Sequence, residues 1–221
     1  MPIDLARIER SDEPVQGWRV WNLREEPLQL EPVGSGVDAW PPGRPVEARC
    51  GASPILTWRH PHSAPDASCT CGIYAATSLE IFDRPRPAWP PPSVVGTVAL
   101  WGRVIEHERG WRAAFAYPAR LRLVCAMCAW FEPGPGVPVA VHRFAHRLYG
   151  LCEHHRGGIQ VPDGRVSKPT DLDPLAVQSR LLDAYGVDLV PVKQTDFLFH
   201  SPPTAEPPPY IPSIRVVPLS R

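Results

Sequence analysis

Two pairs of soft ligands in the second half of the chain could bind a metal ion. Cys125 and Cys128 form a C-x2-C pair, and Cys152 is followed by His154 and His155. Thiolate and imidazole are the ligands that tetrahedral zinc prefers in proteins. The gap between Cys152 and His155 repeats the gap of the first pair, so we favour His155 over His154 as the fourth ligand. The spacing therefore predicts a Cys3His zinc site.

A second group of cysteines lies in the first half of the chain. Cys50 precedes a C-x-C pair, Cys69 and Cys71, and both His60 and His62 lie between them. Two thiolates one residue apart can bind one ion, and His62, which we prefer to His60, would complete a second Cys3His set. Cys50 could instead be a core residue. Ligands from both halves could also combine in a single site or in a two-metal cluster.

A metal site with four protein ligands stabilises a fold and does not catalyse, because no coordination position is left for water or substrate. Such a site contributes on the order of 10 kcal/mol to folding. In a reducing compartment, the six cysteines of this chain are expected to be metal ligands or buried thiols instead of disulfides. The sequence starts without a signal-peptide pattern and has no long apolar run, so we expect a cytoplasmic protein.

The composition predicts a loop-rich fold with many strands. The 221 residues include 30 prolines, and proline breaks both helices and central strands. Hydrophobic residues make up 43% of the chain and charged residues 21%, which is typical of a globular protein with its own core. We therefore expect an α+β fold that is β-rich, with a central hairpin, short helices and one or two zinc knuckle sites.

Proline-rich segments divide the chain into four parts. Residues 1–83 form an N-terminal β-rich half with the possible C-x-C metal site, and residues 84–93 read as a proline-rich connector. Residues 94–200 contain the hairpin, helices and the C-x2-C and C-x2-H pairs. Residues 201–221 are expected to be a disordered proline-rich tail.

The hairpin lies in the β-rich segment 94–125, where Glu108, Arg109 and Gly110 predict a three-residue turn. That turn would place His107 opposite Trp111. Strand alternation then gathers aromatic and arginine side chains on one face, which could stack bases, bind a proline-rich peptide, or pack under another layer of the fold. The candidate binding residues of this face are Trp101, Arg103, Trp111, Phe115 and Tyr117.

Two helices are predicted after the hairpin. Val141, Phe144 and Leu148 recur at helical spacing before Gly150. A stronger pattern begins at Asp173-Pro174, where aspartate can cap the helix and proline can occupy its first position. Its apolar stripe runs to Tyr185 and ends at Gly186, and residues 187–192 read as a following strand.

The favoured function is a non-enzymatic, zinc-stabilised binding or adaptor protein that recognises another protein. Because 23 basic residues balance 23 acidic residues, no global field attracts a phosphate polymer or a membrane surface. One alternative is a nucleic-acid-binding zinc protein that uses the aromatic and arginine face of the hairpin. Another is a zinc-dependent hydrolase with an open metal site, in which Glu106 or Glu108 is the base. Oligomeric state is not indicated.

Three stretches resemble segments of uncharacterised bacterial proteins that are common in actinobacteria. They read CTCGIYA at 69–75, LWGRVIEH at 100–107 and GWRA followed by AYP at 110–118. The resemblance implies no known activity. It implies only that the hairpin and the C-x-C segment belong to one unit.

Overall fold

The computed structural model describes residues 8–33, 39–50, 62–79, 91–131, 134–160, 164–192, 195 and 215–216. This part of the chain is β-rich and contains two helices, so the expectation of a β-rich α+β fold with a central hairpin is confirmed at that level. Of the predicted connector, only residues 91–93 are described, and of the predicted tail only Arg215–Val216. None of the described helices is long and apolar enough to span a membrane.

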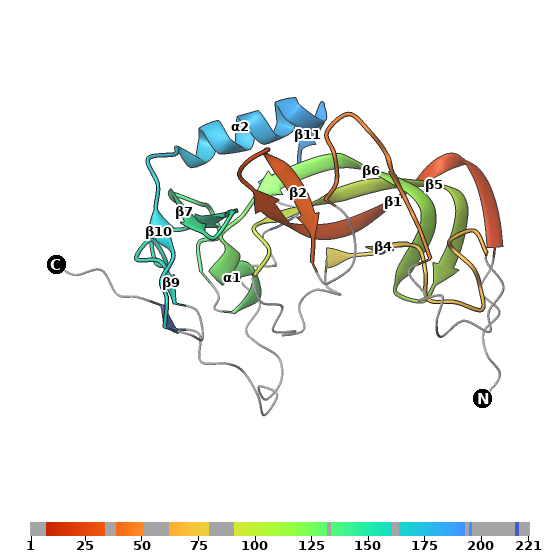
Figure 1. Cartoon of the computed structure of the whole chain (residues 1–221), viewed down its shortest axis with the longest axis horizontal. Helices are drawn as coiled ribbons and strands as arrows, with labels where there is room; N and C mark the ends of the chain where they lie inside the picture. The colour runs from red at the N-terminus through yellow and green to blue at the C-terminus, as the bar shows by residue number, and fades with distance from the viewer. Residues whose placement is uncertain are drawn as a thin grey trace.

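Four strands form a closed ring at the centre of the sheet (Figure 1). Strand β1 (Ile8–Arg24) pairs with β5 (Val94–His107), and β5 pairs with β6 (Gly110–Leu123). Strand β6 pairs with β4 (Ile73–Ala76), which returns to β1 through the pair Trp18 and Ala76. The first and second halves of the chain therefore share one sheet.

A glycine permits the close approach of β1 and β4. A Cβ atom at Gly17 would lie 2.6 Å from the Cβ of Ala75, which real Cβ atoms do not tolerate. Gly110 has the same role on β6, where a Cβ would lie 2.1 Å from the carbonyl oxygen of Ala75. The strands can meet closely because neither glycine carries a side chain.

Shorter strands extend the sheet on both sides of this ring. Four shorter strands extend it on the side of β1, and two short strands pair with β6. On the β1 side, β2 (Gln29–Pro32) and β8 (Arg147–Leu151) pair with β1, β7 (Ala140–Phe144) pairs with β8, and β10 (Lys168–Pro169) pairs with β7. The short strands beside β6 are β3 (Val46–Glu47) and β11 (Asp188–Leu189), while β9 (Ile159–Gln160) and β12 (Arg215–Val216) form a separate pair.

Helix α2 (Pro174–Tyr185) lies across one side of the sheet (Figure 1) and is the helix that the Asp173-Pro174 pattern predicts. The Asp173 side chain accepts hydrogen bonds from the first-turn backbone, and Gly186 ends the helix in the left-handed conformation. Its buried face carries Val177, Leu181 and Tyr185. The Tyr185 hydroxyl accepts from Leu30 N at 2.8 Å and donates to the Trp40 carbonyl at 2.5 Å, so it fixes the helix to the first half of the chain.

The helix predicted from Val141 to Leu148 is wrong, because this segment is the antiparallel hairpin of β7 and β8. Ala145 occupies the turn with φ 54°. Val141 and Leu148 are buried and Phe144 is partly buried in this arrangement, in which β8 pairs with β1 and β7 pairs with β10. Long-range pairing thus overrides a local periodicity.

The predicted register of the central hairpin is also wrong by one residue. His107 pairs with Gly110, so the turn consists of Glu108 and Arg109. The register then shifts between Trp101 and Val104, next to Gly102 with φ 79°. Because one strand carries an extra residue at this bulge, a single alternation rule does not describe the whole hairpin.

Candidate metal centres

The C-terminal cluster comprises Cys125, Cys128, Cys152 and His155, which the structure brings together. Cys125 is the N-cap of the short helix α1 (Ala126–Trp130), so the C-x2-C pair spans one helical turn. Cys152 follows β8 directly, and the His155 amide donates to the Cys152 carbonyl at 3.0 Å in the next turn. The helix start and the strand end are joined by a bridge between Cys125 and Gly150.

The spacing of these four ligand atoms suits a tetrahedral ion. The Cys128 and Cys152 sulfurs are 3.4 Å apart, and His155 Nδ1 lies 3.5, 3.4 and 3.2 Å from the sulfurs of Cys125, Cys128 and Cys152. Ideal zinc bond lengths imply about 3.8 Å between sulfurs and about 3.5 Å between sulfur and nitrogen. The cluster can therefore hold a metal ion with little movement.

This cluster is completely enclosed. Its four residues are at most 3% exposed. They belong to a core cluster that also contains Val124, Met127 and Leu151. The thiols of Cys125 and Cys152 raise the pKa of His155 to about 10. Because imidazole binds a metal in its neutral form and cysteine as thiolate, a bound ion would displace these protons.

Gly134 lies against the C-terminal cluster. A Cβ atom at this position would lie 2.7 Å from the Cys128 sulfur. The segment that contains Gly134 is also held by the Cys125 amide, which donates to the Gly136 carbonyl at 2.8 Å. His154 is exposed and is not among the four clustered residues. The backbone of 134–136 is thus the wall that seals the site.

The N-terminal cluster comprises Cys50, His62, Cys69 and Cys71. The Cys50 and Cys69 sulfurs are 3.8 Å apart, and His62 Nε2 lies 3.3 Å from the Cys71 sulfur. Each of these residues is only partly buried. His60, the alternative to His62, lies outside the described residues. The two clusters are separate groups, so the alternative of one merged site is not supported within the described part of the chain.

Arg112 holds the loop that carries Cys69 and Cys71, a role that the sequence analysis did not predict. It is only 4% exposed, although it is charged. Its guanidinium donates to the backbone carbonyls of both cysteines and to that of Asp66, and its Nε donates to His107 Nε2 at 2.7 Å. A guanidinium presents several donors in a fixed plane, so one side chain fixes the whole C-x-C turn.

The thiols of the two cysteines in the C-x-C pair differ in pKa. A hydrogen bond from the Cys71 backbone lowers the pKa of Cys69 to about 6. Burial raises the pKa of Cys71 to about 11. The Asp66 carboxylate, which accepts from the Ser68 amide at 2.9 Å and from its hydroxyl at 2.6 Å, shapes the turn before Cys69. A thiolate at Cys69 is the form that binds a metal.

The five predicted binding residues do not form one exposed face. Trp101 and Phe115 stack with ring centroids 6.1 Å apart. Tyr117 packs against the core, donates to the Tyr185 carbonyl at 2.9 Å and accepts from Gly43 N at 2.8 Å. Trp111 also packs against the core. Arg103 is exposed, and its guanidinium donates a long hydrogen bond to the Pro65 carbonyl at 3.4 Å. These residues are divided between the core and the surface because the bulge shifts the register of the hairpin and α2 packs against Tyr117.

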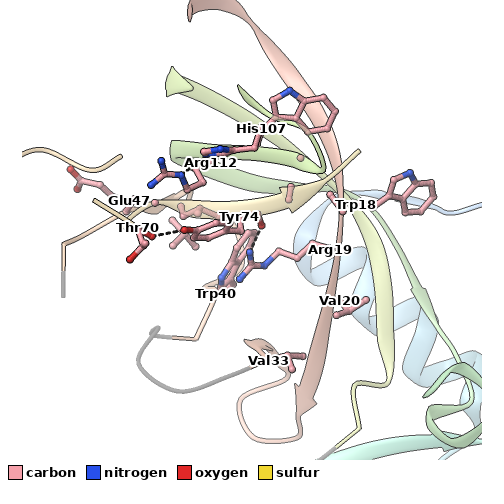
Figure 2. A pocket seen from close by; sticks show the side chains of 18 of the residues that line it. Trp18, Arg19, Val20, Val33, Trp40, Glu47, Thr70, Tyr74, His107 and Arg112 are labelled. Atoms are coloured by element: carbon pink, nitrogen blue, oxygen red, sulfur yellow. Dashed lines mark hydrogen bonds between the residues drawn. The ribbon is translucent and has the colours of Figure 1, made fainter. Parts of the chain in front are cut away.

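A large cleft of about 1460 Å³ lies beside the N-terminal cluster (Figure 2). It is lined by β1, β4 and the segment around β3, and Cys69 lies on its wall. Figure 2 shows Arg19 extending from β1 toward Trp40, with Tyr74 beside them and Arg112 next to His107. Sequence periodicity gives no signal for this cleft, because its walls come from segments that are distant along the chain.

The carboxylates proposed for hydrolysis, Glu106 and Glu108, are exposed at the end of the central hairpin. Neither is part of a metal cluster among the described residues. Both clusters instead offer four ligand atoms from cysteine and histidine. No protein-family model, curated protein or solved structure matches this chain.

Proposed function

We propose that this chain is a non-enzymatic binding protein whose fold is stabilised by two zinc ions. The observation that carries the proposal is that each cluster presents three sulfurs and one imidazole nitrogen within 4.8 Å of one another. Soft thiolates with imidazole in a tetrahedral arrangement favour zinc over magnesium or calcium, which prefer oxygen ligands. A complete set of four leaves no position for substrate, which supports a structural role.

The proposed zinc ions compensate for a chain interrupted by many prolines. Structural zinc contributes on the order of 10 kcal/mol of folding free energy. All six cysteines are free thiols in the structure. Because reduced cysteines persist in a reducing compartment, a cytoplasmic location is part of the proposal.

The proposed ligand is another macromolecule. The balanced net charge supports a protein partner, since it provides no long-range attraction for phosphate polymers. One local observation favours nucleic acid as a second candidate: four arginines and several aromatic side chains line the cleft. A hydrolase would require a metal with three protein ligands and a bound water, and the two four-ligand sets favour the structural role.

Metal analysis of the purified protein tests this proposal. We expect two equivalents of zinc per chain. Cobalt substitution should give the absorption of tetrahedral thiolate coordination, and added azide should leave that spectrum unchanged because no coordination position is open. Absence of stoichiometric zinc would contradict the structural role. A spectrum that shifts with azide would instead support the hydrolase.

A further inference from the structure

Two buried hydrogen-bond donors at the cleft lack an acceptor. Arg19 Nε and Trp40 Nε1 are both buried, and neither has a hydrogen-bond partner in the described part of the chain. Both residues line the cleft, and the Arg19 guanidinium lies 5.1 Å from the centroid of the Trp40 ring. Figure 2 shows the two side chains together. Buried donors are nearly always paired, so these two leave a polar, positively charged region at the wall of the cleft without an acceptor.

The Arg19 charge makes an anionic acceptor the best fit. Its guanidinium donates to the Tyr74 carbonyl but forms no ion pair with any described carboxylate. Burial lowers the pKa of Arg19 to about 10, which reflects the cost of this uncompensated charge. An oxyanion bound in the cleft near the guanidinium would supply the missing counter-charge.

Other charges in the cleft have the same sign. Arg49 and Arg109 are exposed on its walls, and the largely buried Arg112 also lines it. None of these guanidinium groups pairs with a carboxylate among the residues that the structure describes. Glu47 is the acidic residue of the lining. Even with the single negative charge of a Cys3His zinc, the cleft remains net positive.

Aromatic rings accompany these charges. Tyr74 is 49% exposed, although its hydroxyl is fixed by donation to the Thr70 carbonyl at 2.6 Å. Its ring lies 5.8 Å from the Arg112 guanidinium. Trp18 and Trp111 contribute partly exposed rings to the same lining. An exposed but immobilised ring is a ready platform for a planar group, because little rotamer entropy is lost when that group stacks.

The size of the cleft favours a polymer over a single small molecule. Its volume of about 1460 Å³ exceeds the roughly 300–1,000 Å³ of typical small-molecule pockets. A single strand of nucleic acid combines repeated phosphates with planar bases, and grooves that bind such strands combine arginines with aromatic rings. An acidic peptide would match the charges but offers no planar base to stack on the Tyr74 ring.

We propose that this cleft binds single-stranded nucleic acid, with phosphates on Arg19, Arg49 and Arg109 and a base stacked on Tyr74. The proposal takes the zinc-stabilised scaffold from the proposed function and assigns its cleft to nucleic acid, the second candidate there, because the local positive charge of the cleft provides the attraction that the balanced charge of the whole chain does not. It differs from the hairpin-face version because, of the five hairpin residues, only Trp111 lines the cleft.

Fluorescence anisotropy with a labelled oligothymidine of about twelve nucleotides tests this proposal in the full-length, zinc-loaded protein. Arg49→Ala/Arg109→Ala should weaken binding tenfold or more and reduce the slope of log affinity against log salt by about 1.4, since each lost single-strand phosphate contact contributes about 0.7. Tyr74→Ala should weaken binding at least about fivefold, whereas Tyr74→Phe, which keeps the ring, should retain it.

Lys168→Ala/Arg180→Ala is the matched control, because it removes two exposed positive charges outside the cleft. Equal losses in this control and in the Arg49/Arg109 variant would overturn the proposal by showing a non-specific charge effect. Equal or tighter binding of a labelled twelve-residue polyglutamate would overturn it in favour of an acidic protein partner. Absence of oligothymidine binding at low salt would overturn it as well.

Zinc content and thermal melting are measured on the same samples. If zinc is stoichiometric and oligothymidine does not bind, the cleft assignment fails and the proposed zinc scaffold stands. If zinc is absent and binding still follows the cleft variants, the scaffold proposal fails and the cleft assignment stands. The two proposals are therefore tested independently.

Discussion

The two clusters have the same set of donors but occupy different environments. The C-terminal cluster is enclosed by core side chains and by the backbone at Gly134, whereas the N-terminal cluster lies partly exposed on the wall of the cleft. Donor identity alone therefore does not determine what a metal site contributes to this fold. A metal bound in the C-terminal cluster would replace part of the hydrophobic core, and a metal bound in the N-terminal cluster would fix a loop.

The supports of the two clusters differ in the same way. Cys125 and Cys152 are positioned by a helix start and a strand end, which belong to the main sheet region. Cys69 and Cys71 depend on the guanidinium of Arg112. Loss of the first site should therefore disrupt the fold, and loss of the second should release a local segment.

The largest expected effect is that of Cys125→Ser/Cys128→Ser. Removal of a structural zinc costs on the order of 10 kcal/mol, which is comparable to the whole stability of a domain at about 5–15 kcal/mol. We expect loss of cooperative thermal unfolding, measured by circular dichroism. His154→Ala is the control, because this exposed neighbour lies outside the cluster. A variant that melts like the wild type would contradict the proposal that a metal in the C-terminal cluster stabilises the fold.

A smaller effect is expected for Cys69→Ser/Cys71→Ser. The chain should lose one equivalent of zinc and remain folded, with a smaller decrease in melting temperature than for Cys125→Ser/Cys128→Ser, because only a local segment is released. In the wild type, a chelator should remove this zinc first, because the cluster is partly exposed. Simultaneous release of both ions would remove the distinction between the clusters.

Arg112→Lys tests whether the Arg112 guanidinium stabilises the N-terminal cluster. Lysine keeps the charge but cannot reproduce the planar set of donors that binds the Cys69 and Cys71 carbonyls. We expect a loss of about 2 kcal/mol and faster zinc transfer to a chromogenic chelator. Arg103→Lys is the control, because Arg103 makes one long contact on the same hairpin. Identical zinc-release rates in the two variants would show that Arg112 does not support the cluster.

The smallest expected effect is a pH dependence of the free energy of unfolding that comes from Glu31, a residue outside both clusters. Burial would raise the pKa of Glu31, but hydrogen bonds from Arg147 at 2.6 Å and Arg24 at 2.7 Å outweigh it and lower the pKa below the ordinary 4.5. Its contribution is therefore complete above about pH 4.5 and is lost as the pH falls through the lower folded-state value. Glu31→Gln should cost about 1 kcal/mol at pH 7, and denaturant titrations should show this difference shrinking in acid. A constant difference would exclude this ionisation as the cause.

The sequence was most informative where the relevant interactions are local. Cysteine spacing predicted both sets of clustered residues, and Asp173 with Gly186 predicted the limits of α2. Capping depends on neighbouring backbone groups, so a short sequence window contains the necessary information.

Predictions that depend on distant partners were less successful. The hairpin register changes at the Gly102 bulge, and the segment from Val141 to Leu148 becomes two strands because other strands pair with it. Arg19, Trp40 and Tyr74 meet only after β1 and β4 come together. No local pattern indicates such a site, because its residues carry no mutual spacing along the chain.

The position of β1 in the sheet has a consequence for synthesis on the ribosome. β1 can pair with β2 as soon as both have emerged, but its partner Leu148 on β8 is synthesised roughly ten seconds later at typical translation rates. His155, the last ligand of the sealed cluster, emerges only a few residues later. The full ligand set of this cluster and the last strand partner of β1 therefore become available at nearly the same moment.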